Sequence, residues 1–238
     1  MKRALSAFVF LLLATGRQAF ADPAAPRPPD ATYSYVLTYD GTAIGTSTIA
    51  IDGTKPGAVI VKESANFSMP TLTATATMRY NPATLHETQY SADLTLPSGV
   101  QHTDVTVKTG TVSVVAVPGG NSDIPADPSA PLELIGDNLA GTAMLLPAIL
   151  HATGAQTFTV AMLDGGQALV AKVLADMSPT RPSSVPATDV SLSLQCAGMN
   201  EIFWYDPSTY VVHDVAIPAQ EAEFRLTSTT ALGVASRN

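Results

Sequence analysis

The sequence predicts a mainly β protein in which a curved antiparallel sheet, a half-barrel, wraps around a short apolar helix. Three observations support this fold class. Apolar and polar residues alternate with a period of two along most of the chain, and tight turns separate the alternating runs at short intervals. One segment alone has the Ala- and Leu-rich composition of a buried helix. Long helices that would cover a parallel sheet are missing from the pattern, so the strands are expected to form a meander.

The alternation is clearest in the first half of the chain. A first strand places Tyr33 and Tyr35 on one face and ends at the turn Asp40-Gly41, and a second strand runs over 43–51. In residues 71–80, four threonines alternate with apolar side chains, which is typical of a half-buried strand. Further strands are expected near 58–67, 84–96, 101–107, 111–117, 158–162, 167–175, 189–196, 200–206, 209–217 and 221–228.

Residues 138–153 interrupt this pattern and predict the helix. The segment is apolar nearly all round, with Asp137 or Asn138 as a plausible N-cap. Pro147 is expected to kink the helix or to start a second one, because it lacks an N–H group. A helix that is apolar on all sides must be buried, so it is expected to plug the concave face of the sheet.

Proline-rich loops flank this middle region, at 118–131 and 176–187. Loops of this length are either functional lids or slack connections, and the residues favour neither.

A short pattern, Y-[ND]-P-[AS]-T, occurs twice, at Tyr80 to Thr84 and at Tyr205 to Thr209. Asn or Asp before Pro typically opens a type I turn. Two hairpins that independently use the same favourable turn would explain the pattern. The alternative is that each copy marks the same hairpin in two related half-sheets.

The N-terminus predicts export. Lys2 and Arg3 precede an apolar run, and Ala19-Phe20-Ala21 supplies the small residues that a signal peptidase recognises. The expected organisation is a signal peptide over 1–21, a Pro-rich leader over 22–32, one β-rich domain over 33–230 and a tail over 231–238. The apolar run is shorter than the roughly 20 residues that span a bilayer, so no stable membrane insertion is expected after cleavage. The expected location is the periplasm or the exterior.

Charge and cysteine content restrict the partners. The formal charge of −8 becomes −11 when cleavage removes the three basic residues of the signal peptide, and such an acidic surface argues against nucleic acid as a partner. Cys196 is the only cysteine, which excludes an intramolecular disulfide. Its phase with Leu192 and Leu194 favours a buried thiol over a reactive one.

No motif predicts catalytic residues, a metal site or a cofactor. The sequence has no nucleophile elbow, no H-E-x-x-H, no phosphate loop and no dinucleotide fingerprint. The acidic residues Asp123, Asp127, Glu133 and Asp137 lack the spacing of a calcium loop and are expected to be solvated. A site assembled by the fold around His86 or His213 and a nearby carboxylate remains an alternative.

Two stretches carry a family resemblance. The Tyr-x-Tyr strand followed by Asp40 to Gly45, and the segment Ile202 to Pro207 continuing to Glu223 to Leu226, resemble uncharacterised bacterial envelope domains. These are similar to periplasmic lipoprotein carriers (LolA-like), in which a curved antiparallel sheet wraps around a short helical plug. The resemblance implies binding or transport of a lipid-like molecule.

The function expected on this basis is that of a periplasmic carrier with a hydrophobic groove. Apolar residues on alternating strand faces or on the helix are the candidates for lining it: Leu72, Met78, Met144, Leu145, Phe158, Met162 and Trp204. The same residues would equally fill a closed core. The alternatives are an envelope interaction module that pairs with a partner protein through an edge strand, and a hydrolase-type enzyme.

The export signal gives a first prediction. Expressed with its own leader in a Gram-negative host, the protein is expected in the osmotic-shock fraction with Asp22 as its first residue. N-terminal sequencing or intact-mass measurement checks this. Membrane-bound protein that keeps residues 1–21 would contradict it.

Overall fold

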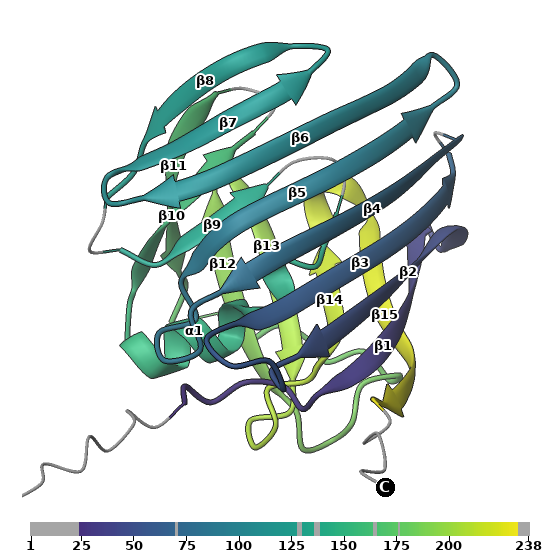
Figure 1. Cartoon of the computed structure of the whole chain (residues 1–238). Coiled ribbons are helices and arrows are strands. Elements are labelled where there is room, and N and C mark those ends of the chain that lie inside the picture. The colour runs from purple at the N-terminus through teal and green to yellow at the C-terminus, as the bar shows by residue number, and fades with distance from the viewer. Residues whose placement is uncertain are drawn as a thin grey trace, which may run out of the picture.

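In the computed structural model, one curved sheet of fifteen strands coils around a core without closing on itself (Figure 1). The structure describes residues 24–69, 71–127, 130–135, 139–163, 166–175 and 177–232. The predicted fold class, a mainly β protein with a curved sheet and one short α-helix, is confirmed. The signal peptide over 1–21 lies outside the described residues. No helix in the described part of the chain is long and apolar enough to cross a membrane.

The first half of the chain contributes eight strands: β1 (Ala31–Tyr39), β2 (Thr42–Asp52), β3 (Val59–Ser68), β4 (Thr71–Tyr80), β5 (Glu87–Leu96), β6 (Gly99–Lys108), β7 (Thr111–Val117) and β8 (Gly120–Pro125). The second half adds β9 (Leu132–Ile135), the 3-10 helix η1 (Ala143–Leu145), α1 (Leu146–Thr153), β10 (Thr157–Met162), β11 (Gln167–Val173), β12 (Val190–Cys196), β13 (Met199–Tyr205), β14 (Val212–Ile217), η2 (Pro218–Gln220) and β15 (Ala222–Ala231).

Two meanders make up the sheet, and they join where β1 pairs with β15. The strand order is β8-β7-β6-β5-β4-β3-β2-β1-β15-β14-β13-β12-β11-β10-β9, and every pair is antiparallel except β9 with β10. The run β1 to β6 and the run β10 to β15 therefore follow the same order, each strand beside the one before it in sequence. The segment between the two runs, residues 109–156, contains β7, β8, β9 and both turns of helix.

The repeated sequence pattern marks equivalent turns in these two runs. It connects the fourth strand to the fifth in each, β4 to β5 and β13 to β14. Asn81 Oδ1 accepts the N–H of Ala83, and Asp206 Oδ1 accepts that of Ser208, at 2.8 and 2.7 Å. Each turn ends in a residue with positive φ, Leu85 and Tyr210. The shared place and geometry agree with the interpretation of two related half-sheets.

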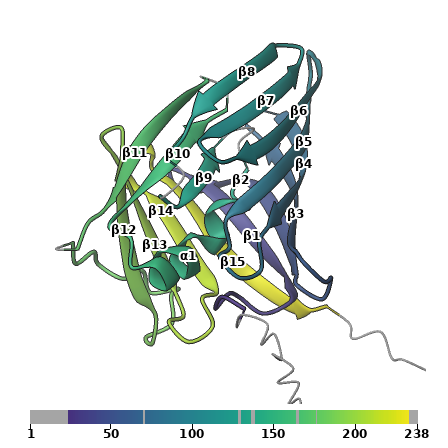
Figure 2. The same ribbon diagram turned by 60° about the vertical axis from the view of Figure 1, so that its left-hand side comes forward.

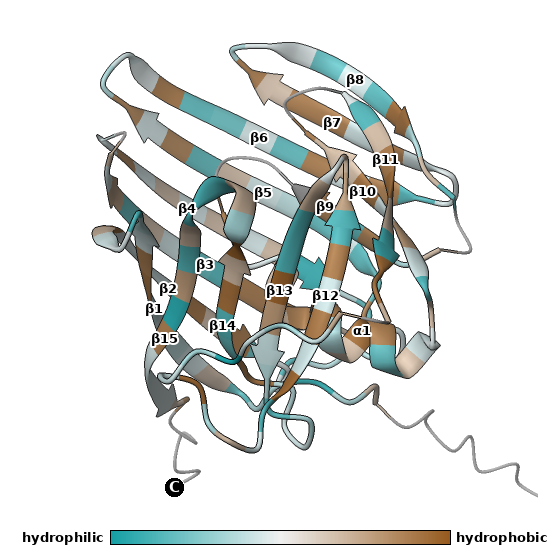
Figure 3. Ribbon diagram, turned by 180° about the vertical axis from the view of Figure 1, so that it is seen from behind, coloured by the Kyte–Doolittle hydropathy of each residue, from teal (hydrophilic) through white to brown (hydrophobic). Residues whose placement is uncertain are grey.

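The period-two alternation separates core from surface as the sequence predicts. Along β4 the threonines are exposed while Leu72, Ala74, Ala76, Met78 and Tyr80 are buried. Figure 3 shows the same alternation of hydrophobic and hydrophilic residues along other strands. The buried faces of most strands meet the helical segment in one continuous core.

The helical segment lies inside the curve of the sheet, towards one end (Figures 1 and 2). It is shorter than predicted, because Leu139 and Ala140 are not helical and η1 begins only at Ala143. Pro147 stands in the first turn of α1, where its missing N–H needs no partner, so it starts the second helix. The expected N-caps, Asp137 and Asn138, lie outside the described residues, and α1 has Leu145 as its N-cap.

The two Pro-rich segments predicted as loops, 118–131 and 176–187, are partly structured in the described residues. In the first, residues 120–125 form β8, an edge strand whose mostly exposed side chains gave no alternating signal. In the second, Val185 packs on the outer face of the sheet with Ile202 and Trp204 in a small separate cluster. This loop therefore covers an outer apolar patch.

Leu145 gives a stability test for the helical segment. Its side chain is 0 % exposed within the main core. Leu145→Ala is expected to lower the free energy of unfolding by about 2–5 kcal/mol, because a close-packed site leaves a cavity. Val170→Ala, at a position 66 % exposed on β11, is the control, with an expected change within about 0.5 kcal/mol. Urea denaturation measures both, and equal effects would contradict the buried position of Leu145.

Candidate functional site

A cavity of about 880 Å³ lies at the end of the barrel where β14 and β15 are joined, and α1 lies at the other end, where His151 contacts Tyr210 in the β13–β14 turn. Its walls come from the ends of β1, β3 and β14, the starts of β2, β4 and β15, the β12–β13 turn, and residues 139–144. Most of the lining is apolar, including Leu37, Phe67, Leu169, Phe203 and Phe224. A volume of this size lies within the range of small-molecule sites, and an apolar lining with few polar groups is typical of them.

Residues 139–144 lie across the inside of the barrel, between this cavity and the core, and a buried carboxylate holds them. Glu63 on β3 accepts the hydroxyl of Ser47 at 2.6 Å and the backbone N–H groups of Gly141 and Ala140 at 2.6 and 3.3 Å. Burial raises the pKa of Glu63, and these hydrogen bonds oppose the rise. A Cβ on Gly141 would lie 2.8 Å from Glu63 Oε2 and 2.9 Å from Met78 Cε, so a larger residue here would require these two side chains to move.

Two further glutamates belong to the cavity wall. Glu133 on β9 is 4 % exposed, and Glu201 on β13 is partly buried. Burial raises the pKa of both groups, and the charge of Glu201 adds to the effect on Glu133. Among the described residues, no side-chain hydrogen bond or ion pair involves either carboxyl. The prediction that Glu133 is solvated is wrong, because this residue stands in a short strand beside buried Val160.

Of the seven residues proposed from the sequence to line a groove, three line this cavity: Leu72, Met144 and Met162. Three others, Met78, Leu145 and Phe158, are fully buried in the main core and do not line it. Trp204 lies on the outer face of the sheet under the second Pro-rich loop, so it is on the other side of β13 from the cavity.

Cys196 also lines the cavity, where the sequence analysis expected a buried thiol. Its side chain does share the inner face with Leu194, but the strand ends here and the residue is partly exposed. Burial, with the charges of Glu133 and Glu201 as smaller contributions, raises the pKa of the thiol. The alternation predicts correctly that Cys196 is on the inner face of the sheet. It does not predict that this part of the inner face borders a cavity.

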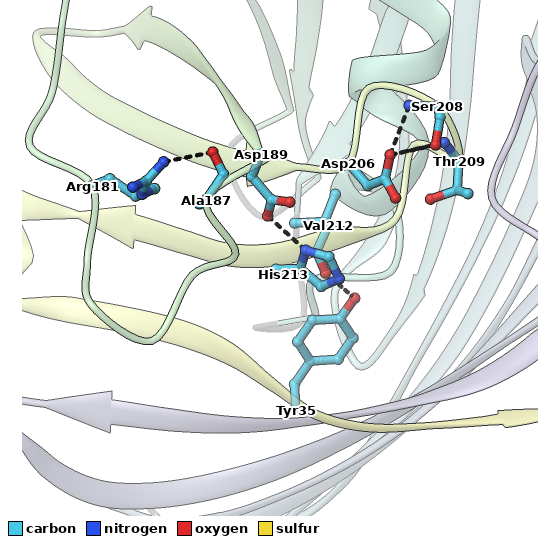
Figure 4. A network of polar contacts seen from close by, with 9 residues as sticks. All are labelled: Tyr35, Arg181, Ala187, Asp189, Asp206, Ser208, Thr209, Val212 and His213. Carbon is cyan, nitrogen blue, oxygen red and sulfur yellow. Dashed lines mark hydrogen bonds and ion pairs between the residues drawn. The ribbon is translucent and has the colours of Figure 1, made fainter.

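A separate polar network lies around His213 on β14 (Figure 4). His213 Nδ1 lies 2.6 Å from Asp189 Oδ2, and the Asp189 side chain is 0 % exposed. An oriented histidine of this kind is one part of a general-base system. The hydrogen bonds of the described residues join no serine, threonine or cysteine side chain to His213, and no metal-ligand group of three or more residues occurs among them. His86 follows the Asn81 turn, and none of the ion pairs between described residues joins it to a carboxylate.

Comparison with known proteins shows the fold alone. No family model matches the chain, and no curated protein matches it. Among solved structures, it is similar to a beta-barrel-like protein of a domain of unknown function, DUF1849, from Brucella abortus. The TM-score is 0.55 at 10 % sequence identity, over 89 % of this chain and 100 % of that one. A curved β-barrel-like architecture is therefore shared.

The buried acids predict an unusual pH dependence. Glu87 is 2 % exposed, its Oε1 has no partner among the described residues, and burial raises its pKa well above the usual value, with Glu133 adding to the rise. A raised folded-state pKa favours the protonated folded form, so this contribution to stability is present at low pH and lost as the pH rises through the folded pKa. Glu87→Gln is expected to gain more free energy of unfolding, relative to wild type, at pH 8 than at pH 5.

Urea denaturation of both proteins at the two pH values measures this difference. Asp123→Asn, an exposed acid on β8, is the control and should show no such dependence. A gain for Glu87→Gln that is the same at pH 5 and pH 8 would show that Glu87 is equally ionised in both states of the protein.

Proposed function

We propose that the protein binds an apolar, lipid-like molecule in the cavity at the open end of its barrel and acts as a carrier outside the cytoplasm. The observation that carries this proposal is the cavity itself, about 880 Å³ with largely apolar walls, beside a continuous core of buried side chains. An empty apolar cavity forgoes the contacts that stabilise a closed core, so an apolar ligand is the natural occupant.

The lining suits a ligand of variable shape. Four methionines line the cavity, Met69, Met144, Met162 and Met199, and their unbranched thioether side chains adapt to different partners. Met69 is 67 % exposed and Met199 is 37 % exposed, so two of them stand at the rim where a ligand would enter.

The architecture supports the same proposal. The resemblance to LolA-like carriers implies a curved sheet around a helical plug with an apolar site, and the described sheet curves around α1 with the cavity at its other end. The similar Brucella structure is beta-barrel-like and adds only that architecture. The predicted signal peptide supports a location in the periplasm or outside the cell.

The edge-strand module is supported less well. Its natural pairing edge is β8, which ends the sheet. A Cβ on Gly166 would lie 3.8 Å from Ser122 of β8, so part of this edge faces the β10–β11 hairpin instead of open space. A partner strand would have less of the edge to pair with.

Filling the cavity tests the proposal. Leu169 lines the cavity, and its neighbour Val170 is 66 % exposed on the opposite face of β11. Leu169→Trp is expected to weaken binding of the neutral apolar fluorophore N-phenyl-1-naphthylamine at least tenfold, because the indole occupies the space. The matched variant, Val170→Trp, is expected to bind it as wild type does.

Fluorescence titration measures both affinities. A second measurement follows alkylation of Cys196 by N-ethylmaleimide, which the bound fluorophore should slow because the thiol lines the same cavity. If wild-type protein binds no apolar fluorophore, or if the two tryptophan variants bind it equally, the carrier proposal fails.

A further inference from the structure

Two carboxyl groups in the wall of an otherwise apolar cavity require an explanation. Glu133 and Glu201 come from β9 and β13, strands that are not neighbours in the sheet, and both contribute to the lining. None of the ion pairs found among the described residues brings a lysine, arginine or histidine to either. Burying acids without a cation or hydrogen-bond donors is costly, so these groups are not placed there for stability.

Glu63 provides the contrast inside the same barrel. It is also buried, yet three donors occupy its two oxygens, from Ser47, Ala140 and Gly141. Glu63 therefore holds residues 139–144 with hydrogen bonds from the protein itself and needs no ligand as a partner. Glu133 and Glu201 have no such donors among the described residues, and they face the cavity that a ligand would fill.

We propose that this cavity takes an amphiphile with a positively charged amine, whose ammonium group lies between Glu133 and Glu201 while its apolar part contacts the methionines and aromatic residues. The inference rests on the proposed function and specifies the class of ligand. An ammonium offers three N–H donors and one positive charge to the two carboxyls.

The charge of the head group is expected to make the cavity prefer ammonium amphiphiles over other amphiphiles. In a poorly solvated cavity, electrostatic interactions are stronger than in water, so a cation beside two acids gains more there than it would at the surface. A fatty carboxylate would place a third acid beside the first two and must either repel them or take up a proton. The formal charge of −11 expected after cleavage also attracts cations and repels anions at a distance.

The test is a competition series at pH 7.5 on the purified full mature protein. Dodecylamine, dodecanol and dodecanoate share one chain length and differ in head group. Each competes with bound N-phenyl-1-naphthylamine and is kept below its solubility limit or its critical micelle concentration. Dodecylamine is expected to displace the fluorophore at a concentration at least tenfold lower than dodecanoate, with dodecanol between them.

Isosteric variants assign the preference to the two acids. The double variant Glu133→Gln/Glu201→Gln is expected to keep the affinity for the neutral fluorophore and to reduce the preference for dodecylamine at least fivefold. Asp214→Asn is the matched control, since Asp214 on β14 is a buried acid that does not line the cavity, and it should change the preference less than twofold. Fluorophore binding by each variant also reports that it is folded.

The outcomes separate this inference from the carrier proposal. A wild-type protein that binds the fluorophore but releases it equally to all three competitors, or most readily to dodecanoate, is still a carrier and overturns the ammonium site. A preference for dodecylamine that survives in the double variant also overturns it, because other groups then recognise the amine. A protein that binds no fluorophore and no competitor overturns both proposals.

Discussion

The hydrogen bonds between Glu63 and the backbone of Ala140 and Gly141 determine how the inside of this barrel is divided. They reach from β3 to a segment 77 and 78 residues further along the chain, and they hold it across the interior. On one side of this segment the helices and strand faces pack into a closed core, and on the other the cavity is open. Because Gly141 has no side chain, the backbone comes close enough for a carboxylate in an apolar environment to be satisfied. Without this link, residues 139–144 would have no polar anchor among the contacts described for them.

The two six-strand runs supply most of the cavity wall, including Glu201, and the part of the chain between them supplies the remaining elements of the site. Glu133 stands on β9, the cavity floor is residues 139–144, and α1 fills the opposite end. The two runs themselves form a regular antiparallel wall in which like-placed turns, at Asn81 and Asp206, have the same hydrogen bonds. A curved wall of this kind encloses a volume, and Glu201 on β13 is one polar group that it adds to the cavity. The intervening segment separates the core from the cavity and adds Glu133 to the lining.

The wall could be predicted from the sequence, and the chemistry of the cavity could not. Alternation of the kind found in β4 indicates a half-buried strand directly, because successive side chains face the core and the solvent in turn. Met78 and Leu72 lie on the same face of that strand, yet one is in the core and the other lines the cavity, and periodicity treats them alike. Trp204 shows a second limit, because a loop distant in sequence covers the outer face and buries apolar residues on both sides of β13. Glu133 shows a third, since a four-residue strand is too short to establish a period.

The interior glutamates differ in how many hydrogen-bond donors from the protein their carboxyl oxygens have. Glu63 has three donors and holds a structural segment, so its cost of burial is offset within the folded chain. Glu87 does not line the cavity and has one oxygen without a partner among the described residues, and its pKa, raised by burial and by Glu133, makes stability depend on pH. Glu133 and Glu201 differ from both, because the space before them is large enough for a ligand and the acids have no donors among the described residues. Burial raises the pKa of both groups, and positive charge or hydrogen-bond donors from a ligand would offset the cost of holding them ionised. The position of these two acids, more than the apolar surface around them, therefore distinguishes a site with a chemical preference from a mere gap in the packing.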